Sequence, residues 1–133
     1  MAKDKPYNSQ QWTLARFRSF VMGNLRRARW PVKYKSLDKA FVGNGKNPKT
    51  GRQCKLHKCS VCWAVLPKGD MVADHIDPVI PIDGFEGEDM FLGYNWNEVI
   101  KRLYCEEDNF QAICKVCHKQ KTQNERKERE KNK

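Results

Sequence analysis

The stretch DNFQAICKVCHKQKT, residues 108–122, joins a Cys-x-x-Cys pair to a histidine that directly follows the second cysteine. An earlier pair, Cys59-Ser-Val-Cys62, precedes it, and 51 residues separate the two pairs. A Cys-x-x-Cys turn directs two thiolates at one metal ion, and two such turns supply the four ligands of a tetrahedral site. The sequence therefore predicts that Cys59, Cys62, Cys114 and Cys117 hold a structural Zn²⁺. Zinc binding in small domains contributes as much free energy as the whole fold, so we expect zinc removal to unfold this region.

The composition bounds the class of protein. The chain has 133 residues, which suits one domain with a modest core. Hydrophobic residues make up 39% of it, no apolar run approaches the ~18 residues that cross a bilayer, and the N-terminus lacks an apolar signal segment. We therefore expect a cytoplasmic protein without a membrane partner. In that reducing compartment six cysteines favour metal binding, with disulfides as the minor alternative.

Three residues stay outside the predicted zinc site. Cys54 and His57 would form half of a second site but lack a matching pair, and Cys105 is expected to be a small buried residue. An iron–sulfur cluster on the four paired cysteines is less favoured than zinc, because such clusters use tighter spacings.

Charge is distributed unevenly along the chain. Residues 1–58 carry 15 Lys and Arg but only 2 Asp and Glu, whereas residues 59–112 carry 3 and 11. Residues 113–133 are basic again, with 8 and 3. The two basic ends and the net charge of +10 indicate a polyanionic partner, most often nucleic acid, with a solubilising surface as the alternative.

The first half of the chain predicts two helices and a loop. Residues 9–31 show a helical pattern, with Ser9 as N-cap and Pro31 as stop signal. Residues 36–42 predict a short second helix. The stretch 43–53 contains glycines and a proline and predicts a polar loop.

The second half predicts a hairpin and two more helices. A turn at 67–70 follows the first cysteine pair and predicts a β-hairpin whose returning strand is 71–76. A Gly- and acid-rich loop over 81–94 leads to a short amphipathic helix over 95–104. A final helix begins near Cys114 and ends in charged residues that we expect to fray.

These elements predict an α+β fold in three segments. Residues 1–53 form a basic helical N-terminal arm, residues 54–125 form the core that carries the cysteines, and residues 126–133 form a charged C-terminal tail.

Asp74, His75 and His118 form a second group of chemically active residues. One zinc ion ties both cysteine turns together, so we expect the strand with Asp74 and the helix with His118 to pack side by side. A carboxylate and an imidazole with open positions suit a divalent cation. Adjacent strand residues point to opposite faces, so His75 reaches the same region only if the chain bends before Pro78. The plain alternative is that these are ordinary polar residues, because Asp-His pairs are common.

The segments CSVC, VADHIDPV and EEDNFQAICKVCHKQKT, in this order, resemble the HNH nuclease family, in its zinc-bearing ββα-metal branch. The resemblance covers residues 55–125 and implies a small treble-clef, ββα-metal core. The sequence is also similar to small phage-encoded HNH proteins, including free-standing homing endonucleases. For a phage-encoded protein the compartment would be the cytoplasm of the host cell, and the partners would include phage or host proteins. The oligomeric state stays open.

The resemblance implies a role for each matching residue. His75 corresponds to the general base that takes a proton from the attacking water, and Asn109 to the asparagine that orients the loop and this base. Asp74 and His118 correspond to the ligands of a catalytic Mg²⁺ or Mn²⁺. The stretch between His75 and Asn109 is longer than in many compact members of the family. Imidazole titrates near pH 6.5, so a neutral histidine is available as a base at physiological pH.

The basic side chains are the expected contacts to DNA phosphates. In the N-terminal arm they are Arg16, Arg18, Arg26, Arg27, Arg29, Lys33 and Lys35. Near the active site they are Lys115, Lys119 and Lys121. No recognisable base-reading module is evident, and we expect the acidic loop 83–89 to point away from the nucleic acid.

The sequence thus predicts a metal-dependent DNA endonuclease that hydrolyses phosphodiester bonds. One alternative is a zinc-stabilised nucleic-acid-binding module without catalysis, and another is a structural or adaptor protein in a larger assembly. Nicking or double-strand cleavage, the target sequence, and preference for DNA or RNA are left open by the sequence.

Overall fold

The computed structural model describes residues 4–132, and within them the chain forms helices and two small antiparallel sheets. The α-helices are α1 (Leu14–Arg27), α2 (Pro31–Lys39), α3 (Trp96–Leu103) and α4 (Lys115–Lys131). The strands are β1 (Phe41–Lys46), β2 (Gln53–Lys58), β3 (Val65–Pro67), β4 (Met71–His75) and β5 (Phe110–Cys114). The predicted α+β class is confirmed. None of the helices in the described residues has the length and apolar character needed to cross a lipid bilayer.

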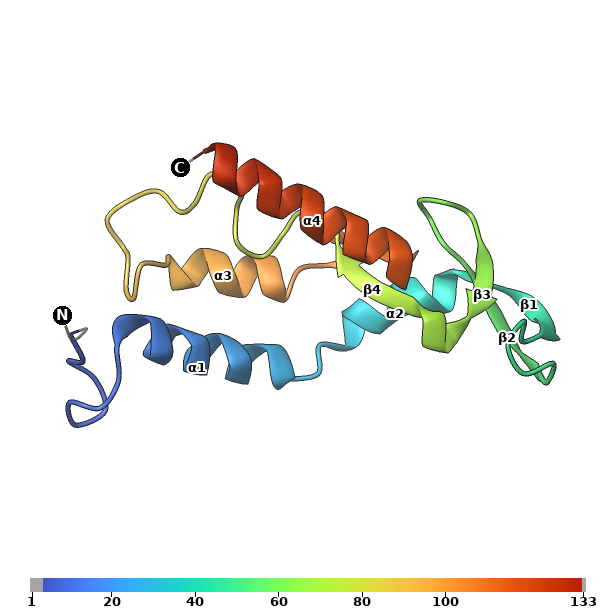
Figure 1. The fold of residues 1–133 in the computed structure, drawn as a ribbon, viewed down its shortest axis with the longest axis horizontal. Coiled ribbons are helices and arrows are strands. Elements are labelled where there is room, and N and C mark those ends of the chain that lie inside the picture. Colours follow the sequence, from blue (N-terminus) through green and yellow to red (C-terminus); the bar gives the residue numbers. More distant parts are fainter. Residues whose placement is uncertain (1–3, 133) are drawn as a thin grey trace.

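The antiparallel pair of β4 and β5 carries Asp74 and His75 of one group of candidate site residues and Cys114 of the other. Its register runs from Met71 opposite Cys114 to His75 opposite Phe110. α4 follows β5 directly, and both α4 and α2 pack against the two strands (Figure 1). One end of this strand pair therefore lies at the cysteines and the other end at His75.

The predicted β-hairpin around residues 67–70 is wrong. β3 pairs with β2 and β4 pairs with β5, so the two strands that flank this turn belong to different sheets. A 3₁₀ turn between them redirects the chain from one sheet to the other. β5 is the better partner for β4 because Phe110 and Ile113 on it are buried. As a result, Asp74 lies opposite Gln111.

The start of α1 also differs from the prediction. Thr13, not Ser9, is the N-cap, and its Oγ1 accepts a hydrogen bond from the backbone N–H of Arg16 at 3.1 Å. Residues 8–10 have φ angles of 53°, 55° and 65°, which a right-handed helix does not contain. Pro31 is the first residue of α2, where a missing N–H costs nothing.

The predicted loop over 43–53 is wrong at both ends. Residues 43–46 belong to β1 and Gln53 begins β2, so the turn itself spans only 47–52. The predicted second helix stops before Phe41 for the same reason, because that residue already starts β1. Glycines and exposed polar residues in β1 give no apolar alternation, which is why the pattern resembled a loop.

The two predicted helices of the second half are confirmed. α3 begins after Asn95, whose Oδ1 accepts a hydrogen bond from the backbone N–H of Glu98 at 3.3 Å. Its apolar face buries Val99 and Leu103. α4 begins after Cys114, whose side chain accepts from the backbone N–H of Cys117.

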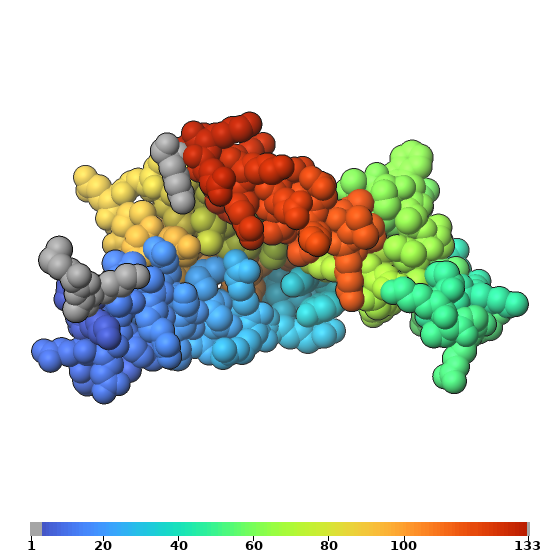
Figure 2. Space-filling model, viewed as in Figure 1, coloured from blue at the N-terminus to red at the C-terminus, as the bar shows by residue number. Residues whose placement is uncertain are grey.

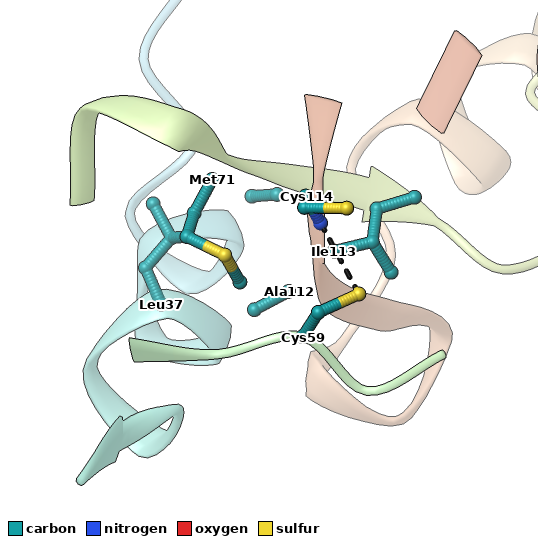
Figure 3. Packing of buried hydrophobic residues seen from close by; sticks show 7 residues of the cluster. Leu37, Cys59, Met71, Ala112, Ile113 and Cys114 are labelled. Carbon is teal, nitrogen blue, oxygen red and sulfur yellow. Dashed lines mark hydrogen bonds between the residues drawn. The ribbon is translucent and has the colours of Figure 1, made fainter. Parts of the chain in front are cut away.

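Two clusters of buried residues join the N-terminal helices to the rest of the chain. The first contains Leu37 of α2 with Cys59, Met71, Ala73, Ala112, Ile113 and Cys114 (Figure 3). The second contains Met22 of α1 with Val79, Val99 and Leu103. The basic N-terminal arm therefore packs against the cysteine-bearing part.

Hydrogen bonds from two aromatic side chains also connect the N-terminal helices to the rest of the chain. Nε1 of Trp30, just before α2, donates to the backbone O of Cys105 at 2.7 Å. The Tyr104 hydroxyl donates to the backbone O of Leu25 at 2.6 Å. Together these bonds hold the end of α1 against the end of α3.

The C-terminal segment continues α4 through Lys131. Arg129 donates to the backbone O of Ile80 at 2.6 Å, and the Asn132 side chain donates to Asp83 at 2.7 Å. These contacts attach the end of the helix to the loop after β4. Residues 1–3 of the predicted arm and residue 133 of the predicted tail lie outside the described residues.

Candidate active site and metal centre

The four paired cysteines converge at one end of the β4–β5 pair. One Sγ atom from each of Cys59, Cys62, Cys114 and Cys117 lies within 4.8 Å of the others. Cys59 and Cys114 are buried, whereas Cys62 is exposed. Four cysteines in this arrangement can hold a metal such as zinc. The predicted cluster is therefore confirmed as a site with the ligands for a metal ion.

Each thiol of this cluster affects the protonation of its neighbours. Burial raises the pKa of Cys59, but backbone N–H donors, chiefly those of Cys62 and Cys114, outweigh it and lower the pKa to about 6. The neighbouring thiol of Cys114, followed by burial, raises the pKa of Cys117 to about 12. One thiolate thus makes a second one unfavourable. A bound cation removes this conflict, because metal coordination deprotonates a thiol outright.

Asp74 and His118 meet on the other side of the same strands. Asp74 Oδ1 lies 3.6 Å from His118 Nε2, and the Asp74 side chain is only 10% exposed. The carboxylate leaves β4 one position before the strand ends, and the imidazole leaves the first turn of α4. At 3.6 Å the two groups are too far apart for a direct hydrogen bond. Two ligand atoms at ~2.1 Å from one divalent cation lie at most ~4.2 Å apart, so this separation fits a shared cation.

His75 faces the same pocket from the end of β4. Its Nε2 lies 2.9 Å from the backbone O of Leu103, and its ring packs on Phe110 with centroids 4.6 Å apart. A carbonyl oxygen only accepts, so Nε2 carries the proton of the neutral ring and Nδ1 holds the lone pair. Burial lowers the pKa of His75 below the usual 6.5, more than the contact with Leu103 raises it. The ring is therefore neutral at physiological pH.

Asn109 holds the chain that follows His75. Its Oδ1 accepts from the backbone N–H of Asp77 at 2.9 Å, and its backbone O accepts from the N–H of Ile76 at 2.8 Å. Its Nδ2 donates to the Asp77 carbonyl at 3.4 Å. The 3₁₀ turn before β5 is thus clamped to the bend after β4. This bend lets Asp74 and His75, adjacent in the chain, face one pocket.

The pocket between these elements has a volume of about 410 Å³. Its titratable lining contains Asp74, His75, His118 and Glu125, and its cations are Arg26, Lys33, Lys121 and Arg129. Arg26 comes from α1 and Lys33 from α2, so the N-terminal helices bring positive charge to the site. The acidic loop 83–89 does not contribute to the lining.

Lys121, predicted as a DNA-phosphate contact near the active site, contacts Asp74 inside the pocket. Its Nζ lies 3.1 Å from Asp74 Oδ2, 2.8 Å from the backbone O of His75 and 3.3 Å from Glu125 Oε1. Its side chain is 24% exposed. Lys121 therefore belongs to the interior of the site, where it neutralises the Asp74 carboxylate. The helical spacing from His118 places both side chains on one face of α4.

Gln111 is a site residue that the sequence did not indicate. Its Nε2 donates to Asp74 Oδ2 at 3.0 Å, and its Oε1 makes a longer contact of 3.4 Å with the hydroxyl of Ser60 in the first cysteine turn. The role of Gln111 becomes evident only from the pairing of β4 with β5, which places this residue directly opposite Asp74.

Of the other side chains predicted to contact DNA, some interact with neighbouring residues of the protein and others are simply exposed. Arg18 donates to the backbone O of Leu92 and stacks on Tyr94, so it is occupied within the fold. Several cations interact with neighbours but stay at the surface; they are Arg16 on Trp12, Arg27 on Asn24, Arg29 on Tyr34 and Lys35 on Glu107. Arg26, Lys115 and Lys119 are exposed.

The residues left outside the predicted zinc site stay apart from it. His57 is 3% exposed, its Nδ1 has no partner among the described residues, and burial lowers its pKa. Cys105 Sγ receives a contact from Asn109 Nδ2 at 3.6 Å. Cys54 is half-buried on β2. Among residues 4–132 they form no second group of metal-binding side chains.

The fold and the site define a small α+β protein with four helices in its described residues, small antiparallel sheets and a four-cysteine cluster that can hold a metal. A separate, cation-lined pocket contains the carboxylates of Asp74 and Glu125 and the imidazoles of His75 and His118. The chain matches no protein-family model, no curated protein and no solved structure.

Proposed function

We propose that the chain is a metal-dependent DNA endonuclease of the HNH type, which hydrolyses phosphodiester bonds. One observation carries the proposal: Asp74, His75 and His118 converge on one pocket, with Asp74 Oδ1 and His118 Nε2 3.6 Å apart. A carboxylate and an imidazole with open positions are suitable ligands for Mg²⁺ or Mn²⁺. The neutral histidine beside them supplies a base.

His75 acts as the general base in this proposal. Its Nδ1 takes the proton of the attacking water, while the bond from Nε2 to the Leu103 carbonyl keeps the ring oriented. The lowered pKa keeps this nitrogen free of a proton at physiological pH. Asn109 maintains the bend after His75 and so fixes the direction of the ring.

Asp74 and His118 hold the divalent cation. When bound, that cation stabilises negative charge on the phosphate and on the leaving 3′ oxygen. Gln111 and Lys121 orient the Asp74 carboxylate through Oδ2, which leaves Oδ1 directed toward His118. Arg26 and Lys33 line the same pocket and attract the phosphate to it.

A non-catalytic nucleic-acid-binding module is the second candidate. The ion pair between Lys121 Nζ and Asp74 Oδ2, at 3.1 Å, favours it, because this contact already satisfies one carboxylate oxygen without a metal. The two candidates share the cysteine cluster and the basic surface. They differ in whether Asp74, His75 and His118 act together in chemistry.

Cleavage of supercoiled plasmid separates these candidates. The zinc-loaded chain is incubated with Mg²⁺ or Mn²⁺ and, in parallel, with no added divalent cation and with EDTA. The nuclease proposal predicts cleavage that needs the added cation and disappears in Asp74→Ala and His118→Ala variants that retain zinc. Plasmid binding without cleavage under every condition supports the binding module instead.

A further inference from the structure

The β1–β2 pair forms a two-stranded ribbon at one end of the molecule. It projects beyond α2 and β3, at the end opposite α1 and α3 (Figures 1 and 2). Two backbone hydrogen bonds close the six-residue turn at 47–52: the N–H of Asn47 donates to Arg52 O and that of Gly51 donates to Asn47 O, both at 2.8 Å. The ribbon is therefore a defined structural element.

The outer part of this ribbon, residues 44–46 and 53–55, has one face made of polar side chains. Cross-strand register places Asn44 opposite Lys55 and Lys46 opposite Gln53, and side chains alternate along each strand, so all four share a face. All four residues are exposed. Within the described residues, no side-chain hydrogen bond or ion pair involves any of them. Their donors and acceptors are free to meet a ligand.

In the same outer part, the opposite face carries small and apolar residues. Gly45 pairs with Cys54, and Leu56 covers Gly45 so closely that an added Cβ would lie 2.6 Å from the Leu56 Cδ1 atom. The ribbon therefore presents its polar face outward.

All charged side chains of the ribbon are positive. Residues 41–58 contain five Lys and Arg and no Asp or Glu. The turn is tied back to the body through Lys49, which pairs with Asp70 at 3.3 Å. Lys46, Arg52 and Lys55 have no acidic partner among the described residues. The surface thus carries unneutralised positive charge next to free amides.

We propose that the β1–β2 ribbon inserts into the major groove of duplex DNA and reads base edges with Asn44, Lys46, Gln53 and Lys55. The major groove admits a two-stranded ribbon, and asparagine, glutamine and lysine are the side chains that pair with adenine and guanine there. The cations of the ribbon supply phosphate contacts. Duplex RNA fits less well, because its major groove is deep and narrow.

This inference supplies the target recognition of the proposed nuclease and rests on the proposed function only for the link to cleavage. DNA reading by the ribbon and hydrolysis at Asp74, His75 and His118 involve different residues. Each is therefore tested by its own measurement.

The test is selection of bound duplexes from a library of random sequence, by zinc-loaded protein with no added divalent cation. The wild type is compared with Asn44→Ala/Gln53→Ala. The matched control is Asn97→Ala/Gln123→Ala, which removes one exposed asparagine and one exposed glutamine from α3 and α4. Zinc content and circular dichroism verify that each variant is folded.

The expected result is that the wild type and the control enrich one motif, with about 5- to 150-fold discrimination per read base pair. Asn44→Ala/Gln53→Ala binds duplex DNA but loses this preference. Lys46→Ala/Lys55→Ala also weakens this preference, whereas Arg52→Ala, at an exposed cation of the turn, weakens binding to every sequence and lowers the slope of log K against log salt by about 1.

Three results overturn the inference: no enriched motif with the wild type, the same motif with Asn44→Ala/Gln53→Ala, or tighter binding to duplex RNA than to duplex DNA. Plasmid cleavage, assayed separately with Mg²⁺, decides the proposed function. Selective binding without cleavage leaves the ribbon inference standing and removes the nuclease. Cleavage without selection does the reverse.

Discussion

The cysteine cluster and the Asp74–His118 pair share α4, which carries Cys117 and His118, yet they differ in chemistry. The cluster gathers four sulfur atoms within 4.8 Å and leaves no position for a further ligand in a tetrahedral site. The pair offers one oxygen and one nitrogen, and it opens into a pocket of about 410 Å³. The first arrangement suits a structural ion, and the second suits a cation that must also contact a substrate.

The cysteine cluster helps to position His118 of the Asp74–His118 pair. Cys117 and His118 are consecutive residues of α4, and consecutive helical residues point about 100° apart. The first therefore faces the cysteine cluster while the second faces Asp74. Closing the cluster fixes the start of α4, and with it the place of the imidazole.

Removal of zinc, or Cys114→Ser, is expected to have the largest effect. Apparent zinc-binding free energies of about 10–16 kcal/mol in small domains equal or exceed the stability of such a domain. Near-UV circular dichroism should show loss of fixed tertiary structure. Cys54→Ser, outside the cluster, should leave the spectrum unchanged. A zinc-free chain that unfolds cooperatively with unchanged stability would show that the cluster is not structural.

Removing a proposed ligand of the divalent cation should reduce function nearly as much, but should change the stability of the fold only slightly. Asp74→Asn or His118→Ala should weaken Mn²⁺ binding more than about 100-fold, because a direct ligand contributes more than a residue that only orients one. Paramagnetic resonance of Mn²⁺ measures this affinity, with Asp108→Asn as an exposed control. Equal affinity in all variants would mean that the pair does not bind the cation.

Gln111→Leu should show an intermediate effect. Gln111 holds Asp74 Oδ2 at 3.0 Å, and residues that orient a metal ligand typically contribute about 10–100-fold in metal affinity or activity. Mn²⁺ affinity and plasmid cleavage should both fall while zinc content stays constant. Gln123→Leu, on the surface of α4, is the matched control. If Gln111→Leu behaves like that control, Asp74 is held without its help.

Tyr104→Phe should have the smallest effect and should change stability alone. It removes the 2.6 Å bond from the hydroxyl to the Leu25 carbonyl, and one such bond contributes about 0.5–1.5 kcal/mol. Urea denaturation of the zinc-loaded protein measures the change. The control variant Tyr34→Phe should lower the stability by less than Tyr104→Phe does. An unchanged midpoint in Tyr104→Phe would mean that this bond does not hold α1 to α3.

The sequence indicated the cysteine cluster because thiol spacing alone predicts a shared metal. It also indicated which strand and helix the cluster would bring together, which led to Asp74 and His118. Lys121 was predicted as a phosphate contact near the active site, but its contact with Asp74 was not, because that contact depends on how deeply α4 packs on β4. Gln111 was missed, because its role requires the pairing of two strands that are far apart in the chain.

The missed strands have a common physical cause. β1 alternates glycine with exposed polar residues, so nothing in its hydrophobic pattern distinguishes it from a loop. β5 is short and almost wholly buried, a pattern that periodicity does not separate from other apolar segments. Turn residues at 67–70 favoured a local hairpin, whereas long-range packing of β4 against β5 prevailed.

The most direct test of the division of roles is one measurement on His75→Ala: zinc content and plasmid cleavage with Mg²⁺, determined on the same sample as for wild type. A general base contributes about 10²–10⁴-fold to the rate. We predict one zinc per chain in both proteins and a loss of cleavage of that size in His75→Ala. Cleavage by His75→Ala at the wild-type rate, with zinc retained, would contradict the assignment of chemistry to this pocket.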